Sequence, residues 1–511
     1  MKRVFCIVMM IMALVVVPSC RYGNEPSKEN AEEKTESITI YSLKDDTLCP
    51  VLTDNDANRQ MLGIVYESLV KLKSDMDAEG VLAESWSVSP DGLIWTFNLR
   101  KGVKWHNGES FSAEDVVYTI NQIKTAQPIS YSYNVRHIEN AEAMGNSVVI
   151  TLNEPCPLFV NLMTFPIVKK SEEDINRESF YPVGTGAYIF PEKAEGNVYV
   201  LKRNDLWWGG KAKLDEIKVK ILPDSETIAY SFSSGNIDIA DAKWGQSKQT
   251  GIGDLRKTPC PLPVYDFIGI NHNDLVLKNK EVRKAISYAI RREKIVNDIF
   301  AGNGIKANAP VRDGWFLSEE KGDYKADSVS AENFLLKNEW KKDGGAYSKK
   351  TSSGVLKPEF ELIVNEENSS RINIAESVKL DMEAIGMNVR VVPLPFEEYE
   401  NRISSEDYQM FLGSVMIPDD VDLTFLVGNG NMFSYQNEKM DKILADIKNS
   451  QNRDTLIKNY GRFKNLFVDE LPIVGICFEN FDMIYSKKVK GVLEPTMSNR
   501  YMGIYNLYTG K

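Results

Sequence analysis

The sequence holds few of the residues from which metal centres and redox sites are built. Its 511 residues include three histidines and six cysteines. None of the histidines, His106, His137 and His272, pairs with another at ligand spacing, and the cysteines match no zinc or redox motif. We therefore expect no dedicated metal centre and no cofactor, and we expect His106 to be structural.

Catalytic motifs are also missing. The sequence contains no G-x-S-x-G, no H-E-x-x-H and no P-loop. The G-x-G pairs at Gly184, Gly251 and Gly302 lack the third glycine of a dinucleotide site. Only its 72 acidic residues leave an exported hydrolase open as an alternative. We expect a protein that is not an enzyme.

Positive charge is in deficit. The chain carries 61 basic and 72 acidic residues, a formal net charge of −11. An acidic surface repels phosphate backbones, which argues against a nucleic-acid partner. The hydrophobic fraction of 43% and aromatic fraction of 10% indicate a globular chain, and the length suggests about three domains.

Long apolar runs are confined to the N-terminus. Val4 to Val17 is uncharged and follows Lys2 and Arg3, but it is shorter than the ~20 residues of a membrane-spanning helix. The run ends in Val17-Pro18-Ser19-Cys20, which resembles the lipobox of bacterial lipoproteins. This resemblance implies a signal peptide over 1–19, a diacylated Cys20 and attachment to the extracytoplasmic face of the cell membrane. Ordinary secretory cleavage is the alternative.

Residues 20–37 are polar and predict a flexible tether between the membrane and the folded body. Four further cysteines of the mature chain follow, Cys49, Cys156, Cys260 and Cys477. We expect them to be buried free thiols, with one disulfide left open.

Apolar periodicity alternates between strand and helix, which predicts a mixed α/β fold. Alternation predicts strands over 37–41, 95–99 and 388–393, and helical spacing predicts a helix over 61–72. Ser112 with Asp115 has the pattern of a capping box, and Asn279 is placed to cap another helix. A helix over 370–385 should end at Gly386.

Several stretches resemble extracellular solute-binding proteins of the peptide/nickel family, family 5, which feed ATP-binding-cassette importers. The longest runs from Leu82-Ala83-Glu84-Ser85-Trp86 through Leu99-Arg100-Lys101-Gly102 to Phe111-Ser112-Ala113-Glu114-Asp115-Val116. Shorter matches are Gly184-Thr185-Gly186-Ala187-Tyr188, Trp207-Trp208-Gly209-Gly210 and Glu281-Val282-Arg283-Lys284-Ala285-Ile286. They follow the family's order over nearly all of the mature chain.

The resemblance implies a periplasmic-binding-protein-like clamp of two lobes joined by a two-segment hinge. Lobe I would comprise 38–265 and 485–511, with 61–170 as an extra subdomain. Lobe II would comprise 266–484. A ligand enclosed between the lobes would favour their closure. The expected partners are the ligand and the permease subunits of an importer, and the expected state is a monomer.

Peptide-binding members carry a Trp and an Asp in the stretch that matches 411–425, where the Asp holds the peptide ammonium. Here Ser414 stands at the Trp position, and Ile417 stands near the Asp position with Asp419 two residues on. Asp419 is therefore the candidate ligand for an ammonium, with a solvent-facing loop carboxylate as the alternative. The aromatic residues that we expect at the cleft, with a place in the core as the alternative, are Tyr265, Phe267, Trp244, Phe478 and Phe481.

The main functional hypothesis is thus a membrane-anchored receptor that captures an oligopeptide or dipeptide for import. A different solute, such as a metal chelate or glycoside, is the first alternative, because the 411–425 motif is incomplete. A receptor for peptide pheromones is the second.

Overall fold

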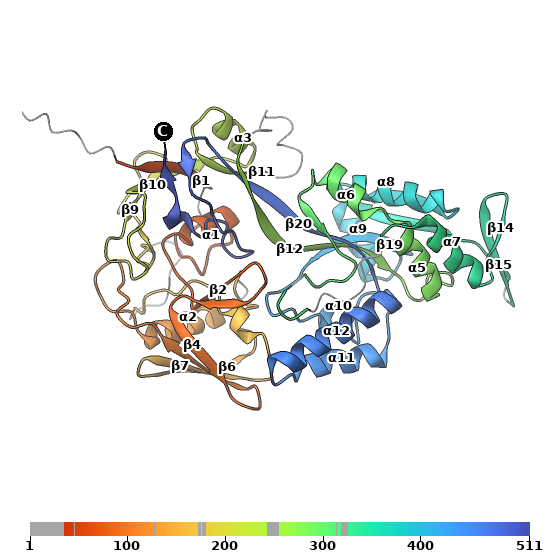
Figure 1. Ribbon diagram of the computed structural model, residues 1–511, viewed down its shortest axis with the longest axis horizontal. Helices are drawn as coiled ribbons and strands as arrows, with labels where there is room; N and C mark the ends of the chain where they lie inside the picture. The colour runs from red at the N-terminus through yellow and green to blue at the C-terminus, as the bar shows by residue number, and fades with distance from the viewer. Residues whose placement is uncertain are drawn as a thin grey trace, which may run out of the picture. The chain divides into compact units, whose positions relative to one another are not determined.

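The computed structural model describes residues 35–44, 46–126, 129–171, 175, 180–242, 255–312, 314–317, 325–352 and 354–510. The chain divides into two units, 1–35 and 36–511, and nearly all described residues belong to the second. Its first strand, β1 (Ser37–Leu43), pairs in parallel with β10 (Glu216–Leu222). These strands form a four-stranded sheet in the order β1-β10-β9-β8, with β9 at Val198–Arg203 and β8 at Tyr188–Ile189 (Figure 1).

A second four-stranded sheet is wholly antiparallel, in the order β4-β5-β7-β6. Its strands are β4 (Ala83–Val88), β5 (Ile94–Leu99), β6 (Ile138–Met144) and β7 (Ser147–Leu152). Trp95, Phe97 and Leu99 alternate inward along β5 and are at most 5% exposed, as the sequence pattern predicts.

Helix α2 (Ala113–Thr125) covers the antiparallel sheet and begins at its predicted cap. The Ser112 backbone N–H donates to Asp115 Oδ2 at 2.8 Å, which satisfies one of the free donors at the helix start. Val116, Ile120 and Ile123 of the same helix are fully buried. The predicted apolar face is therefore the face that packs against the sheet.

The predicted helix over 61–72 is wrong. The helix here is α1 (Asp56–Leu62), and Val70–Leu72 instead forms strand β2, which pairs with β3 (Ala78–Gly80). Tertiary contacts override the helical spacing, because the carbonyl oxygen of Val65 accepts a hydrogen bond from the Gly186 N–H at 2.9 Å. A Cβ added at Gly184 would lie 1.9 Å from that oxygen, so this close approach requires glycine.

Two long antiparallel strands, β12 (Lys257–Ile270) and β20 (Val474–Tyr485), run side by side through the middle of the molecule (Figure 1). They are central in a seven-stranded mixed sheet of order β11-β20-β12-β19-β17-β18. The other strands are β11 (Ile239–Ala242), β19 (Met410–Met416), β17 (Glu359–Asn365), β18 (Asn388–Leu394) and, beside β20, β13 (Gly304–Lys306).

Helices cover both faces of this sheet. One core contains Ile268, Ile270 and Leu412 together with side chains of α5 (Lys280–Ala289), α6 (Arg292–Ile299) and α8 (Ser369–Ala384). The other contains Phe267 and Phe411 with side chains of α11 (Glu438–Lys448) and α12 (Arg453–Glu470). The Asn279 cap of α5 and the end of α8 before Gly386 (φ 85°) are as predicted.

The remaining elements are short. The helices are α3 (Glu226–Ser233), α7 (Ser328–Lys337), α9 (Phe396–Ser404), α10 (Thr424–Val427), η1 (Phe159–Leu162) and η3 (Ile504–Asn506). The strands are β14 (Lys341–Asp343), β15 (Ala346–Thr351), β16 (Gly354–Leu356), β21 (Val489–Lys490) and β22 (Tyr508–Thr509).

The long strands pass from one hydrophobic core to another. Cys260 in β12 and Phe481 in β20 belong to the core that underlies β1 and α2. Tyr265 and Phe478 belong to the core beneath α11 and α12. The chain thus changes core between 260 and 265 and again between 478 and 481, and the predicted crossings at 265–266 and 484–485 lie in the same two strands.

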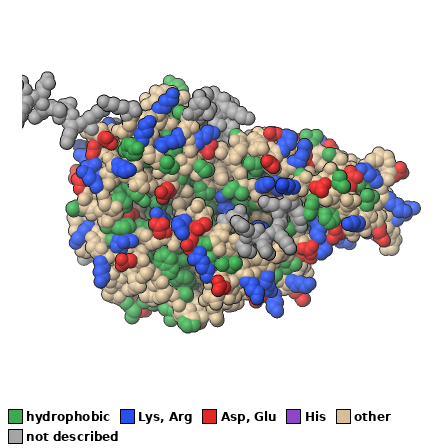
Figure 2. Space-filling view, viewed as in Figure 1, with side chains coloured by type: hydrophobic (Ala, Val, Ile, Leu, Met, Phe, Trp, Pro, Cys, Tyr) green, Lys and Arg blue, Asp and Glu red, His purple; other side chains and the backbone are tan. Residues whose placement is uncertain are grey.

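The four cysteines among the described residues are buried and free, which confirms the free-thiol expectation. Among the described residues, no helix has the length and hydropathy to cross a membrane. Figure 2 shows Lys and Arg side chains interspersed with Asp and Glu over one face, without a large patch of one sign. The predicted signal peptide and Cys20 lie outside the described residues.

Candidate functional site

The loop between β19 and α10 (417–423) contains the candidate Asp419, which contacts residues in and just after η1. The Asn161 side-chain amide donates to the Asp419 carbonyl oxygen at 3.1 Å, and Thr164 Oγ1 donates to Asp419 Oδ2 at 3.4 Å. Burial, followed by the neighbouring Asp420 charge, raises the pKa of Asp419 to about 7. Asp419 is half-buried, and a ligand ammonium beside it would favour its charged form.

Asp420, the next residue, joins this loop to the segment that follows α2 by an ion pair and a hydrogen bond. Arg136 donates to Asp420 Oδ2 at 2.8 Å and contacts Asp422 at 3.2 Å, while the Tyr133 hydroxyl donates to Asp420 Oδ1 at 3.1 Å. The Asp420 side chain is 1% exposed. Burial alone would raise its pKa, but hydrogen bonding by His137 and the charge of Arg136 hold it below the ordinary value.

Thr164 also lines a cavity of about 270 Å³ that we call the tryptophan cavity. Its wall combines helix α1, strands β2 and β3, the Trp207-Trp208 turn and the C-terminal segment. Its charged and aromatic lining residues include Arg59, Glu67, Lys71, Glu79, Tyr131, Trp207, Trp208, Tyr501 and Tyr505. Apolar walls with a few placed polar groups are typical of small-molecule sites.

Glu67 is the carboxylate in this wall with the most hydrogen bonds. It accepts from Trp207 Nε1 at 3.0 Å, from Trp208 Nε1 at 2.9 Å and from Thr185 Oγ1 at 2.8 Å. Burial raises the pKa of Glu67 to about 7 against the lowering effect of these donors. Glu67 holds both indole rings through their N–H groups, so the aromatic wall is held in place before any ligand arrives.

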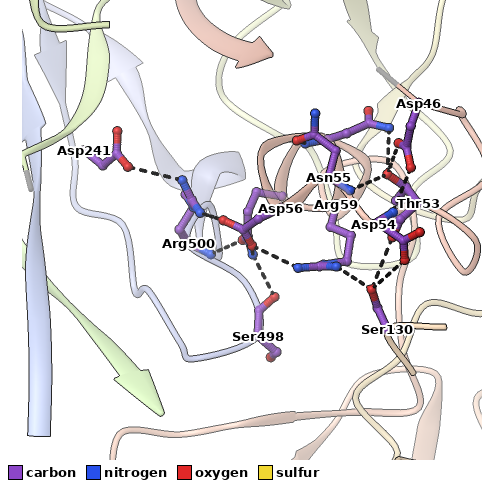
Figure 3. Close-up of polar contacts among 12 residues, drawn as sticks. Asp46, Thr53, Asp54, Asn55, Asp56, Arg59, Ser130, Asp241, Ser498 and Arg500 are labelled. Carbon is purple, nitrogen blue, oxygen red and sulfur yellow. Dashed lines mark hydrogen bonds and ion pairs between the residues drawn. The ribbon is translucent and has the colours of Figure 1, made fainter. Parts of the chain in front are cut away.

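A polar network connects the cavity wall to the C-terminal segment (Figure 3). Arg59 donates to Ser130 Oγ at 2.6 Å and lies 3.4 Å from Asp56 Oδ1. Asp56 also pairs with Arg500, whose other nitrogen lies 3.5 Å from Asp241 Oδ2. Burial alone would raise the pKa of Asp56, but the two guanidinium groups lower it. Arg59 is thus held at the cavity as a fixed positive charge.

The cavity therefore presents charges of both signs. Lys71 and Glu79 form an ion pair at 3.0 Å on the β2–β3 hairpin, and Arg59 faces the cavity from α1. Asp419 stands beside Thr164 on its margin. Such an arrangement suits a ligand that carries an ammonium and a carboxylate together with apolar groups.

The predicted aromatic residues lie elsewhere. Tyr265 contacts Phe267 and Phe478 with ring centroids 6.1 and 5.0 Å apart, and all three are at most 3% exposed. Phe481 is buried in the core beneath β1. None of these four residues lines the tryptophan cavity. Their role at a ligand stays a prediction, whereas their place in the cores is observed.

The two remaining predicted site positions are Ser414 and Trp244. Ser414, on β19, accepts a hydrogen bond from Arg371. Trp244 lies outside the described residues. His106, predicted to be structural, is fixed between the Gly184 N–H and the Gly186 carbonyl oxygen, and burial lowers its pKa to about 4.

Sequence reasoning missed the cavity residues Arg59, Glu67 and Tyr131, and it named Trp207 and Trp208 only as part of a match to the family. The adjacent tryptophans before Gly209-Gly210 were a usable signal, because two indole N–H donors in a turn need buried acceptors. Arg59 and Tyr131 gave no such signal, because their neighbours in space are remote in the sequence.

Comparison with known proteins identifies the family of this chain. The family model for bacterial extracellular solute-binding proteins, family 5 middle, matches residues 77–433. The chain is 24% identical to the oligopeptide-binding protein OppA of Bacillus subtilis, with 98% of each chain covered. It is 25% identical to the dipeptide-binding protein DppE of the same organism, with 92% of each chain covered.

Solved structures agree in fold. A nickel ABC transporter protein from Bacillus halodurans superposes with a TM-score of 0.79 at 22% identity, covering 93% of this chain and 100% of that one. The unliganded open form of the periplasmic murein tripeptide-binding protein MppA also gives 0.79, at 19% identity, covering 93% and 98%. The chain therefore belongs to the family 5 bacterial extracellular solute-binding proteins and has their mixed α/β bilobal fold.

Proposed function

We propose that this protein captures a short peptide and delivers it to an ATP-binding-cassette importer. Asp419 carries the proposal, because it is a half-buried carboxylate with one weak side-chain partner, Thr164, at the margin of the tryptophan cavity. A peptide ammonium would supply the missing positive charge, in a charge-assisted bond worth roughly 1.5–3 kcal/mol. OppA and DppE, which are similar to this chain, are named for oligopeptide and dipeptide binding.

The size of the cavity favours a short ligand. Its volume of about 270 Å³ is near the lower end of the roughly 300–1,000 Å³ typical of small-molecule sites. Arg59 and Lys71 are the cations placed to receive a peptide carboxylate, and Trp207 and Trp208 are the rings placed to contact side chains.

The test uses a library of di- to pentapeptides, with bound species identified by mass spectrometry and affinities measured by calorimetry. N-acetylation of the best peptide removes the ammonium, and we expect affinity to fall roughly 10- to 150-fold, the equivalent of 1.5–3 kcal/mol. Asp419→Asn should cause a similar loss, whereas Asp407→Asn, at a side chain 78% exposed, should not. A folded protein that binds no peptide would refute the proposal, and insensitivity to acetylation would refute the role of Asp419.

A second candidate is a non-peptide solute such as a metal chelate. Ser414 stands where peptide-binding members carry a tryptophan, and it is engaged by Arg371. Relatives of comparable similarity include a heme-binding protein of Haemophilus influenzae, 23% identical. A chelate retained by the purified protein, with no peptide bound, would favour this candidate.

We also propose that the receptor is a monomeric lipoprotein without enzymatic activity. Cleavage before Cys20 would leave residues 20–37 as a tether, and lobe I (38–265 with 485–511) and lobe II (266–484) would close on the ligand. The N-terminal pattern and the family support this proposal. Mass spectrometry of the mature N-terminus would detect the lipid on Cys20, and an unmodified cysteine would contradict it.

A further inference from the structure

A second cluster of chemically active side chains lies apart from the tryptophan cavity. His137 and Cys156 approach Asp420 of the β19–α10 loop, and one ligand atom of each lies within 4.8 Å of the others. All three residues are buried, at 6%, 7% and 5% exposed. They line a separate cavity of about 40 Å³, which shares no lining residue with the tryptophan cavity. One water needs roughly 10–15 Å³ of such space.

The distances suit a small cation. His137 Nε2 lies 3.6 Å from Asp420 Oδ2, and Cys156 Sγ lies 3.9 Å from the same oxygen. Ligands held about 2.0–2.3 Å from a tetrahedral Zn²⁺ are about 3.3–3.7 Å apart. The two distances to Asp420 are within a few tenths of an ångström of these values, and the His137 and Cys156 ligand atoms lie within 4.8 Å of each other.

The orientation of His137 is the second observation that points to a cation. Glu154 Oε1 lies 3.1 Å from His137 Nδ1, and a carboxylate can only accept, so it holds the ring proton on Nδ1. The lone pair of Nε2 then faces another acceptor, Asp420 Oδ2. A second ring proton on Nε2 gives the hydrogen bond from His137 that lowers the pKa of Asp420, and in the site proposed below a metal ion takes the place of that proton. A histidine whose second nitrogen is fixed by a carboxylate is also the usual form of a zinc ligand.

We propose that His137, Cys156 and Asp420 form a Zn²⁺ site that joins the β19–α10 loop to the region from His137, just before β6, to Cys156, just before η1. Thiolate, imidazole and carboxylate are the ligand types that Zn²⁺ takes in proteins, and this combination disfavours Mg²⁺ and Ca²⁺. The ion is structural, because it stabilises the arrangement in which these two segments are in contact.

The surrounding charges permit a divalent cation. Arg136 approaches Asp420 Oδ2 at 2.8 Å, but it also contacts Asp422, so it keeps a carboxylate partner. Glu154 adds a further negative charge and pairs with Lys448. A thiol ligates Zn²⁺ as a thiolate, so binding should release the Cys156 proton to solvent, about one per ion.

The test uses the full chain, reduced and stripped of metal, with Co²⁺ and Zn²⁺ as the probes. We expect one ion per chain and a thiolate-to-cobalt charge-transfer band, with Zn²⁺ displacing Co²⁺. Cys156→Ser should abolish the band, whereas Cys260→Ser, at another buried free cysteine, should retain it. Glu154→Gln should weaken Zn²⁺ binding roughly 10- to 100-fold, as expected for loss of the partner that orients His137.

Three outcomes would overturn the site: no uptake of either metal, a band that survives in Cys156→Ser, or equal loss in Cys260→Ser. If Nε2 carries a proton in place of the ion, the protein will take up neither metal, and the NMR signals of the His137 ring will shift with pH. Thermal unfolding of each variant without metal shows that it is folded. Because the two cavities are separate, failure here leaves the peptide proposal untouched, and Asp419→Asn should retain the Co²⁺ band.

Discussion

Arg136 holds the β19–α10 loop against the segment after α2, and its replacement by methionine should loosen that contact. The change keeps much of the side-chain volume but leaves the carboxylate of Asp420, 1% exposed, without its cation. Breaking a buried pair from one side costs about 3–5 kcal/mol. Tyr133 still donates to Asp420 at 3.1 Å, which offsets about 1–1.5 kcal/mol. We therefore expect a net loss of about 1.5–4 kcal/mol.

Hydrogen exchange measures this loss without a ligand. The Trp315 N–H donates to the Asp75 carbonyl oxygen at 2.9 Å, and this bond joins the β2–β3 turn to a segment packed in the core of α11 and α12. If the contact opens as a unit, Arg136→Met should speed exchange in a peptide containing Trp315 roughly 10- to 900-fold, the equivalent of about 1.5–4 kcal/mol.

Lys448→Met is the matched control. Its pair with Glu154 joins α11 to the segment after β7, and Lys448 lines the same small cavity as Asp420. The side chains of the pair are 43% and 41% exposed, so its removal should cost less than about 1 kcal/mol. The double variant Arg136→Met/Asp420→Asn should recover most of the protection, because the uncompensated charge is gone. Unchanged exchange at Trp315 in Arg136→Met, or an equal effect from Lys448→Met, would refute the reasoning.

Two further predictions concern pH and packing. The pKa of Asp419 is raised to about 7, so the folded state binds an extra proton between about pH 4 and 7, and this carboxyl makes stability fall as pH rises through that window. Asp419→Asn should make the free energy of unfolding, measured by chemical denaturation, depend less on pH in that window. Glu67, whose pKa is also raised to about 7, contributes a slope of the same sign, which Glu67→Gln should remove. An unchanged slope in Asp419→Asn would contradict its burial. Gly475→Ala would place a Cβ 1.9 Å from the Tyr265 hydroxyl and 2.6 Å from a backbone oxygen. We expect the free energy of unfolding, measured in urea, to fall by at least about 1–3 kcal/mol. A neutral effect would contradict this packing.

Local sequence signals predicted much of the fold. The Ser112–Asp115 pattern located the start of α2, and Gly386 located the end of α8, because caps and left-handed turns depend on neighbouring residues. The helix expected over 61–72 was wrong for the opposite reason. Its periodicity was real, but hydrogen bonding between Val65 and Gly186, far apart in the sequence, decided the backbone.

The candidate site was harder to predict than the fold. Asp419 could be singled out from its place after β19, but its partners Thr164 and Asn161 lie more than 250 residues earlier. The aromatics at the two strand crossings were named for the cleft because of their position, and the structure shows Tyr265 and Phe267 packed in a core. Which face of a strand points inward depends on register, and register is set by pairing across the sheet.

Closure around a bound peptide is the central claim, and small-angle X-ray scattering tests it most directly. The radius of gyration is measured for the ligand-free protein and again after saturation with the best peptide from the library. We predict that it decreases on binding in the wild type, and that at the same peptide concentration the decrease is smaller in Asp419→Asn. A peptide that binds tightly and leaves the scattering curve unchanged would contradict the account.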